Sequence, residues 1–221
     1  MRTLLFCTAY AESPEVWENR YLPWHQHYFN SSLKVNNLLI VDDASPTRPD
    51  FLSENEYHRF ENRLGRQAAH VYPGWYRSFS YGVLSGFDKG FDKIIHAESD
   101  AFLLSDRVIE FVNSIESGWH TFWSPQHNLH ESALQVICRD QYNSAKNFLN
   151  VIYDSYSGIC MDSILPYTHV HKHFTGDRYG DYLDHIPQDV DYSCQTRPGW
   201  VTRFKANEKA LLQKLQAEDP R

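Results

Sequence analysis

The sequence predicts an α/β fold in which a mostly parallel central sheet is flanked by helices. Short apolar runs at residues 4–10, 38–41 and 93–97 have the length and composition of buried strands. Apolar residues at helical spacing occupy the segments 14–29 and 75–87 between them. Strands that alternate with helices form βαβ units, so we expect the first half of the chain to build a parallel sheet.

The first helix is expected over residues 14–29. Ser13 is a suitable N-cap, and Pro14 stands at the first helical position, where its missing N–H costs nothing. Four aromatic residues recur at spacings of three and four and define one face: Trp17, Tyr21, Trp24 and Tyr28. We expect this face to pack in the core.

The remaining elements are weaker in pattern. In chain order we expect a polar surface helix or loop at 53–66, a short strand at 69–72, a helix at 108–115 capped by Ser105 or Asp106, strands at 120–123 and 133–137, and a helix at 142–153. Residues 167–200 are rich in Gly, His, Asp and aromatics, which favours functional loops. A single domain over 1–205 is expected, with a helical tail at 206–221.

Composition excludes several classes of protein. The 221 residues are 42% hydrophobic, and 21 Lys and Arg stand against 28 Asp and Glu, a net charge of −7 that argues against a nucleic-acid surface. No apolar run approaches the roughly 18–20 residues that span a bilayer, and the N-terminus lacks a secretory pattern. Four scattered cysteines (Cys7, Cys138, Cys160, Cys194) favour reduced thiols. We therefore expect a soluble, cytoplasmic protein.

Polar side chains gather where three predicted strands end. In open α/β sheets, ligands bind beyond the carboxyl ends of the strands. Glu98 and Asp100 are two residues apart, so both would point to one side of an extended chain and offer the hard oxygen ligands that Mg²⁺ or Mn²⁺ prefers. The alternative is a turn with solvated acids. The other strand ends carry Thr8 and Tyr10, and Asp42 and Asp43.

The second strand ends in Val41-Asp42-Asp43-Ala44-Ser45-Pro46. A carboxylate at such a position accepts hydrogen bonds from ribose hydroxyls in dinucleotide-binding folds. An Asx turn before Pro46 is the alternative. One aspartate is sufficient for that turn, so the second is surplus to it.

This order of motifs resembles that of GT-A nucleotide-sugar glycosyltransferases. In that family the first acidic pair contacts the nucleoside, and an Asp-x-Asp motif binds a divalent cation that bridges the diphosphate. The sequence departs from the motif at Glu98, where Asp is usual. The resemblance implies that Asp100 is the main ligand of Mn²⁺ or Mg²⁺, supported by Glu98. It also implies that Ser99 and the strand end Thr8-Ala9-Tyr10 line the nucleotide-sugar pocket.

A later segment resembles the His-aromatic-x-Gly loop of some glycosyltransferases, whose His completes the metal shell. The match is His173-Phe174-Thr175-Gly176. It implies that His173 is a metal ligand and that Gly176 lies at the donor. Lys172 and Arg178 would then neutralise the departing diphosphate. An independent zinc site of His169, His171 and His173, or plain surface histidines, are the alternatives.

Two acids are candidates for the catalytic base. The resemblance places Asp162 where inverting enzymes carry an acidic residue that opens a helix, and an N-cap is its alternative role. Glu131 is the second candidate. The resemblance also implies that Arg77 contacts the nucleoside or its phosphates; a surface arginine paired with an acid is the alternative.

The resemblance implies a metal-dependent hexosyltransferase that moves sugar from a nucleotide diphosphate sugar, most readily a UDP-sugar, to a saccharide acceptor in glycan or polysaccharide synthesis. Residues 1–105 would bind the donor and 106–205 the acceptor. The tail would be a terminal helix, an oligomer contact or a linker to a further domain. One alternative is a sugar-phosphate nucleotidyltransferase, although Thr8-Ala9-Tyr10-Ala11-Glu12 lacks the usual Gly-rich basic loop. The other is a non-enzymatic carbohydrate-binding module, which needs aromatics but no acidic strand ends.

Overall fold

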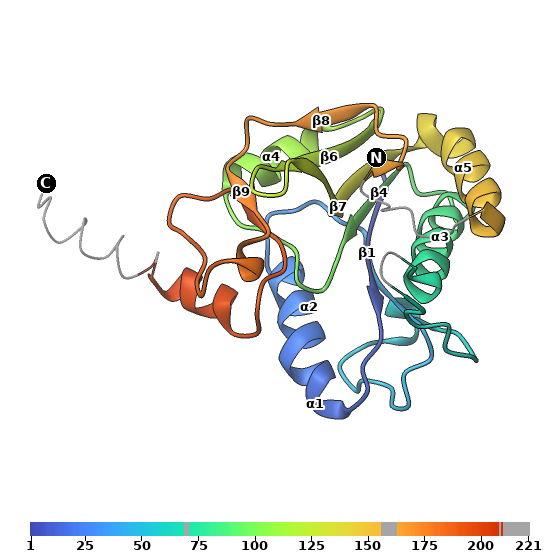
Figure 1. Ribbon diagram of the computed structural model, residues 1–221, viewed down its shortest axis with the longest axis horizontal. Helices are drawn as coiled ribbons and strands as arrows, with labels where there is room; N and C mark the ends of the chain where they lie inside the picture. Colours follow the sequence, from blue (N-terminus) through green and yellow to red (C-terminus); the bar gives the residue numbers. More distant parts are fainter. Residues whose placement is uncertain (69–70, 156–162, 208, 210–221) are drawn as a thin grey trace, which may run out of the picture.

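The computed structural model describes residues 1–68, 71–155, 163–207 and 209 (Figure 1). Its centre is a seven-stranded sheet in the order β3-β2-β1-β4-β7-β6-β8. In chain order these strands are β1 (Thr3–Ala9), β2 (Asn37–Asp42), β3 (Tyr57–Arg59), β4 (Lys93–Ala97), β6 (Trp119–Ser124), β7 (Leu129–Cys138) and β8 (His169–His171). Only β7 runs antiparallel to its neighbours, so the predicted α/β fold with a mostly parallel sheet is confirmed.

Helices cover both faces of this sheet (Figure 1). On one face, α2 (Leu22–Phe29) and α4 (Asp106–Ser114) contribute to one hydrophobic cluster with Leu5 and Cys7 of β1. On the other face, α3 (Pro73–Asp88) and α5 (Tyr142–Ser155) contribute to a second cluster with Leu4 and Phe6 of the same strand. Successive side chains of a strand point to opposite faces, which explains why β1 is apolar throughout.

The helix predicted over residues 14–29 contains a wide turn. It consists of α1 (Pro14–Val16), the π-helix η1 (Trp17–Tyr21) and α2. The N–H of Leu22 donates to the carbonyl of Trp17, five residues earlier. Pro23 has no N–H for the bond that a regular helix would form there, which favours the wide turn. Arg20 lies within this turn.

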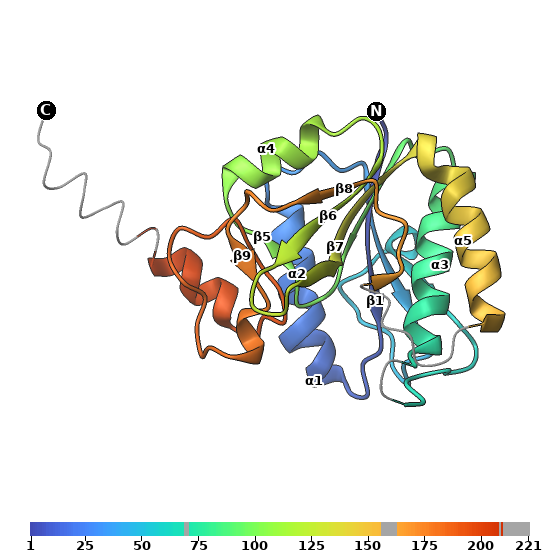
Figure 2. The same cartoon turned by 45° about the horizontal axis from the view of Figure 1, so that its top comes forward.

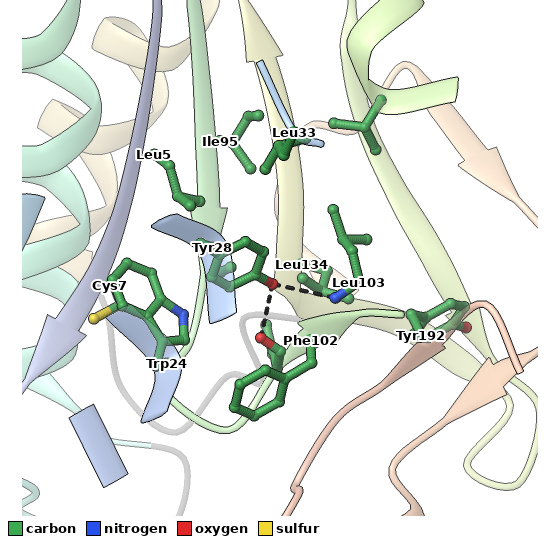
Figure 3. Close-up of a cluster of buried hydrophobic side chains, with 14 of the residues drawn as sticks. Leu5, Cys7, Trp24, Tyr28, Leu33, Ile95, Phe102, Leu103, Leu134 and Tyr192 are labelled. Carbon is green, nitrogen blue, oxygen red and sulfur yellow. Dashed lines mark hydrogen bonds between the residues drawn. The ribbon is translucent and has the colours of Figure 1, made fainter. Parts of the chain in front are cut away.

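The aromatic face of this helix is buried, as predicted. Figure 3 shows Trp24 and Tyr28 beside Leu5 and Cys7, and both aromatic side chains are at most 1% exposed. The hydroxyl of Tyr28 donates to the carbonyl of Ala101 at 2.9 Å and accepts from the N–H of Leu103 at 3.3 Å. The helix is therefore fixed to the segment that follows β4.

A second sheet and a helix form the side of the molecule opposite α3 and α5 (Figures 1 and 2). The sheet joins β5 (Phe102–Leu103), β10 (Tyr192–Ser193) and β9 (Gly176–Asp177). The helix, residues 200–207, packs through Trp200 and Phe204 onto the preceding loops, which include η5 (Tyr179–Asp181).

Several smaller predictions have clear outcomes. The hydroxyl of Ser105 accepts from the N–H of Val108, so Ser105 is the cap of α4. Residues 53–66 were predicted as a surface helix or loop. They contain a single turn of 3-10 helix, η2 (Glu54–Glu56), followed by the edge strand β3. The strand predicted at 69–72 falls partly outside the described residues, and Val71 forms only an isolated bridge with Ala68. Most of the predicted tail at 206–221 also lies outside them.

Cys7, Cys138 and Cys194 are buried free thiols, and Cys160 lies outside the described residues. Among the helices that the structure describes, none has the length and apolarity needed to cross a bilayer.

Helix α3 approaches the sheet through glycine. A Cβ at Gly82 would lie 2.3 Å from the Phe6 ring, and one at Gly86 would lie 2.6 Å from Ile94 Cδ1. Gly82→Ala gains about 1 kcal/mol of helix propensity, but overpacking costs about 1–3 kcal/mol. We therefore expect urea denaturation to show a lower free energy of unfolding. Ser85→Ala on the same helix removes a hydroxyl that has no hydrogen-bond partner among the described residues, and it should be nearly neutral. An unchanged stability in Gly82→Ala would contradict this packing.

Candidate functional site

The carboxyl ends of β1, β2 and β4 meet at one edge of the sheet and border a cavity of about 250 Å³. We call it the strand-end cavity. The predicted residues Thr8, Ala9, Tyr10, Asp43, Glu98 and Ser99 all line it. A second cavity of about 300 Å³, the outer cavity, is lined by Asp100 and by residues of the C-terminal loops. The two cavities share Arg20 and Ser99.

Glu98 is held by three elements. Its carboxylate accepts from Thr8 Oγ1 of β1 at 2.8 and 3.0 Å and from Trp75 Nε1 of α3. His96 Nε2 of β4 lies 2.9 Å from its Oε1. Burial raises the pKa of Glu98, but His96 and the hydrogen bonds from Trp75 and Thr8 outweigh it and hold the pKa below its usual value. Glu98 is therefore ionised at neutral pH.

Asp100 pairs with Arg20. Arg20 Nη2 lies 2.7 Å from Asp100 Oδ2, and Arg20 Nε donates to Ser99 Oγ at 2.6 Å. Burial raises the pKa of Asp100; the Arg20 charge lowers it and the Glu98 charge raises it, and the net result is a raised pKa. The guanidinium thus binds two consecutive residues of the predicted metal motif.

Asp43 organises a loop at the cavity wall. Its carboxylate accepts from the backbone N–H groups of Leu64 and Gly65, the latter at 2.7 Å, and from Arg77 Nη2. Gly74 leaves the space for it, since a Cβ there would lie 2.1 Å from Asp43 Oδ2. Arg77 does not line the cavity, contrary to its predicted contact with the donor. Its guanidinium instead fixes Asp43 and stacks on Phe60, with 3.9 Å between Arg77 Cζ and the ring centroid.

Asp42 does not face the cavity, which corrects its predicted contact with a nucleoside. Its side chain is fully buried. It accepts from Ser45 N at 3.1 Å, from Ser45 Oγ at 2.6 Å and from Tyr57 OH at 2.5 Å. These bonds form the turn after β2, which was the alternative reading of the motif.

Three arginines line the strand-end cavity. Besides Arg20, these are Arg63, whose guanidinium lies 3.6 Å from the Tyr10 ring centroid, and Arg66, which lies 4.9 Å from that of Tyr72. Arg63 and Arg66 flank Leu64 and Gly65, so Asp43 sets the position of both. Asp43 and Glu98 line the same cavity, so its wall carries both carboxylates and guanidinium groups, and the two carboxylates are bound by protein partners.

A divalent cation is implied by the resemblance, but the described donors do not fit one. The Glu98 carboxylate is already engaged by Thr8, Trp75 and His96, and Asp100 is paired with Arg20. Among the residues that the structure describes, no three His, Cys, Asp or Glu side chains are grouped to hold a metal ion. The predicted set of Asp100, Glu98 and His173, and a zinc site of three histidines, are therefore not assembled.

His173 is exposed and packs on aromatic rings. Its ring centroid lies 4.2 Å from that of Phe174 and 6.0 Å from that of Phe111 on α4. His171 bonds instead to His120, with 2.9 Å between His171 Nε2 and His120 Nδ1. Burial, with the charges of the neighbouring histidines, lowers the pKa of His171 to about 4. His120 and His171 therefore link β6 to β8 at the edge of the sheet.

The other predicted residues of the second half lie outside both cavities. Lys172 Nζ lies 3.7 Å from the Trp123 ring centroid, and Gly176 packs against the Tyr192 ring. Arg178 Nε donates to Glu131 Oε2 at 2.8 Å, and the Glu131 side chain is fully buried. A base must reach the acceptor hydroxyl, so this place does not suit Glu131. Asp162 lies outside the described residues.

The sequence predictions missed Arg20, Arg63, Arg66 and Trp75 as site residues. One signal was available for Arg20, because it adjoins Tyr21 on the inward aromatic face of its helix. Arg63 and Arg66 carried a weaker signal. Their loop Arg63-Leu64-Gly65-Arg66 precedes α3, and Gly65 has a φ of 60°, which favours glycine.

Comparisons with known proteins agree with this fold. A glycosyltransferase involved in the glycosylation of the major capsid of PBCV-1 is similar with a TM-score of 0.50 and 9% identity, over 95% of this chain and 100% of that one. The galactosyltransferase LgtC in complex with donor and acceptor sugar analogs has a TM-score of 0.52 and 7% identity, over 92% and 94%. An active-site mutant of LgtC reaches 0.54 at 7% identity, over 94% and 95%. No protein-family model and no curated protein matches the chain by sequence. The chain has the GT-A fold of nucleotide-sugar glycosyltransferases.

The bond from Thr8 to Glu98 predicts a pH-dependent stability. Thr8→Val removes one donor from the ionised carboxylate, and we expect the free energy of unfolding at pH 7 to fall by about 1–3 kcal/mol. The pKa of Glu98 is lowered in the folded state, so this stabilisation exists above the ordinary pKa and disappears as pH falls through the lowered one. The difference between variant and wild type should therefore shrink below about pH 4.5.

Urea unfolding followed by tryptophan fluorescence at pH 7 and at successively lower pH measures this difference. Thr121→Val is the matched control, because Thr121 Oγ1 donates to the backbone carbonyls of Glu131 and Leu134. Its loss should be independent of pH. An equally constant loss in Thr8→Val would contradict the role given to Glu98.

Proposed function

We propose that this protein is a glycosyltransferase that moves a sugar from a nucleotide diphosphate sugar to a saccharide acceptor. The observation that carries the proposal is the strand-end cavity of a GT-A fold, lined by Arg20, Arg63 and Arg66. Such a cavity suits an anionic ligand, because arginine matches phosphate oxygens in charge and geometry. The proposed donor is a UDP-sugar, as the sequence resemblance implies.

The two cavities suit a two-substrate reaction. We place the nucleotide in the strand-end cavity, where Tyr10 and Tyr72 provide ring faces for the base. We place the acceptor in the outer cavity, where Asn19, Asp181 and Gln195 offer hydrogen-bonding groups for saccharide hydroxyls. Arg20 and Ser99 border both cavities, so the reacting sugar would lie next to them.

The chain's own residues supply charge stabilisation at this junction. When the glycosidic bond to the diphosphate breaks, negative charge grows on the leaving phosphate oxygens. Fixed cations aimed at that charge stabilise the transition state. The predicted Mn²⁺ or Mg²⁺ dependence is not part of the proposal, because Glu98 and Asp100 are engaged by protein partners.

Product analysis tests this function against the sequence-based alternatives. The full chain is incubated with a panel of nucleotide sugars and saccharides, and a glycosylated acceptor with free nucleotide diphosphate is the expected product. Pyrophosphate released from a nucleoside triphosphate and a sugar phosphate would indicate a nucleotidyltransferase. Glycan affinity without affinity for any nucleotide would indicate a binding module. Either result would refute the proposal.

Nucleotide binding should depend on Asp43 through the loop that it holds. UDP at about a hundredfold excess over its Kd should raise the free energy of unfolding by about 2.7 kcal/mol, which thermal shift detects. Asp43→Asn weakens the acceptor for Leu64, Gly65 and Arg77, so we expect UDP affinity to fall about tenfold. The exposed Asp50→Asn should bind UDP like wild type. Equal UDP affinity in Asp43→Asn and wild type would show that this loop does not form the site.

A further inference from the structure

We infer that the guanidinium of Arg20 takes the role of a divalent cation at the end of β4, so that the donor diphosphate is bound by arginines without a metal ion. This inference rests on the proposed function and specifies how its donor is held. In this inference Ser99 and Asp100 position a cationic side chain and do not bind a metal ion.

The first support is where Arg20 is bound. Its Nε and Nη2 contact Ser99 Oγ at 2.6 Å and Asp100 Oδ2 at 2.7 Å. Asp100 is the predicted main metal ligand, and Ser99 lies between it and Glu98 in the same motif. The π-helical turn η1 brings Arg20 to this place from the helix after β1. The Arg20 side chain is 45% exposed and borders both cavities. Its Nη1 has no hydrogen-bond partner among the described residues, so two N–H groups remain for phosphate oxygens.

The second support is that the carboxylates of Glu98 and Asp100 already bind protein groups. A magnesium-type ion requires close to octahedral oxygen coordination, usually through one or two carboxylates plus water and phosphate. Glu98 Oε1 is surrounded by Thr8, Trp75 and His96, so only Oε2, which accepts from Thr8, keeps room for a further ligand. A divalent ion on Asp100 Oδ1 would lie next to the Arg20 guanidinium on Oδ2, which places a cation beside a cation. The geometry therefore favours the arginine.

The third support is the charge of the cavity wall. Arg63 and Arg66 line the strand-end cavity beside Arg20, and neither is paired with a carboxylate in the described part of the chain. Asp100 compensates Arg20, and Arg77 compensates Asp43, which also lines the cavity. Glu98 is a further negative charge on this wall, bound by Thr8, Trp75 and His96. Arg63 and Arg66 therefore remain to oppose the negative charges of a nucleoside diphosphate. The planar guanidinium also allows two parallel hydrogen bonds to one phosphate group.

Calorimetric titration of the full chain with UDP, in EDTA and in MnCl₂, tests the inference. We expect equal affinity in the two buffers, within about twofold. In EDTA, Arg20→Ala should weaken UDP binding about tenfold or more and leave the weaker binding of uridine unchanged, because uridine has no phosphate. Arg20→Lys keeps the charge but loses the planar fork, so its UDP affinity should lie between the two.

Arg48→Ala is the matched control. Arg48 is 41% exposed and is paired with Glu54, as Arg20 is paired with Asp100, but Arg48 borders neither cavity. The Arg48→Ala variant should therefore bind UDP with wild-type affinity. If Arg20→Ala does not fold, two measurements still test the inference. They are the UDP affinity of the wild type in EDTA and in MnCl₂, and the UDP affinity of Arg20→Lys. Wild-type binding only with Mn²⁺, or wild-type affinity in both Arg20 variants, would overturn the inference and leave the proposed function intact. No binding of any nucleotide diphosphate in either buffer would overturn both.

Discussion

The ionised carboxylate of Glu98 is the constraint on which the edge of the sheet depends. A buried charge is costly unless donors and opposite charges surround it. Thr8 of β1, Trp75 of α3 and His96 of β4 supply these partners, so the three elements must meet at one point. This junction fixes the end of β1 next to the end of β4, and with it the mouth of the strand-end cavity.

The other acids along this edge of the sheet also hold protein groups in place. Asp42 forms the turn after β2, Asp43 holds the loop that carries Arg63 and Arg66, and Asp100 holds Arg20. The acids therefore serve as anchors for backbone N–H groups and guanidinium groups. The cavity that results has arginines on its wall, although the chain as a whole has a net charge of −7.

Much of this architecture was predictable from local patterns. Apolar runs and helical spacings predicted the sheet and its main helices, and β4 has the bounds expected. The strand-end residues Thr8, Asp43 and Glu98 line one cavity. The partners of each acid were not predictable, because they come from residues far along the chain, such as Arg20 for Asp100. His173 illustrates the same limit, since its loop motif is local but its place against Phe111 follows from the position of β8 at the sheet edge.

We propose that arginines at the strand ends, held by carboxylates, bind the diphosphate of a nucleotide. A crystal structure of the full chain with UDP, grown in EDTA, would locate the diphosphate. We expect it in the strand-end cavity, with phosphate oxygens within hydrogen-bonding distance of Arg20 and the Arg20–Asp100 pair intact. A nucleotide bound elsewhere, or an Arg20 side chain turned away from the phosphates, would contradict this proposal.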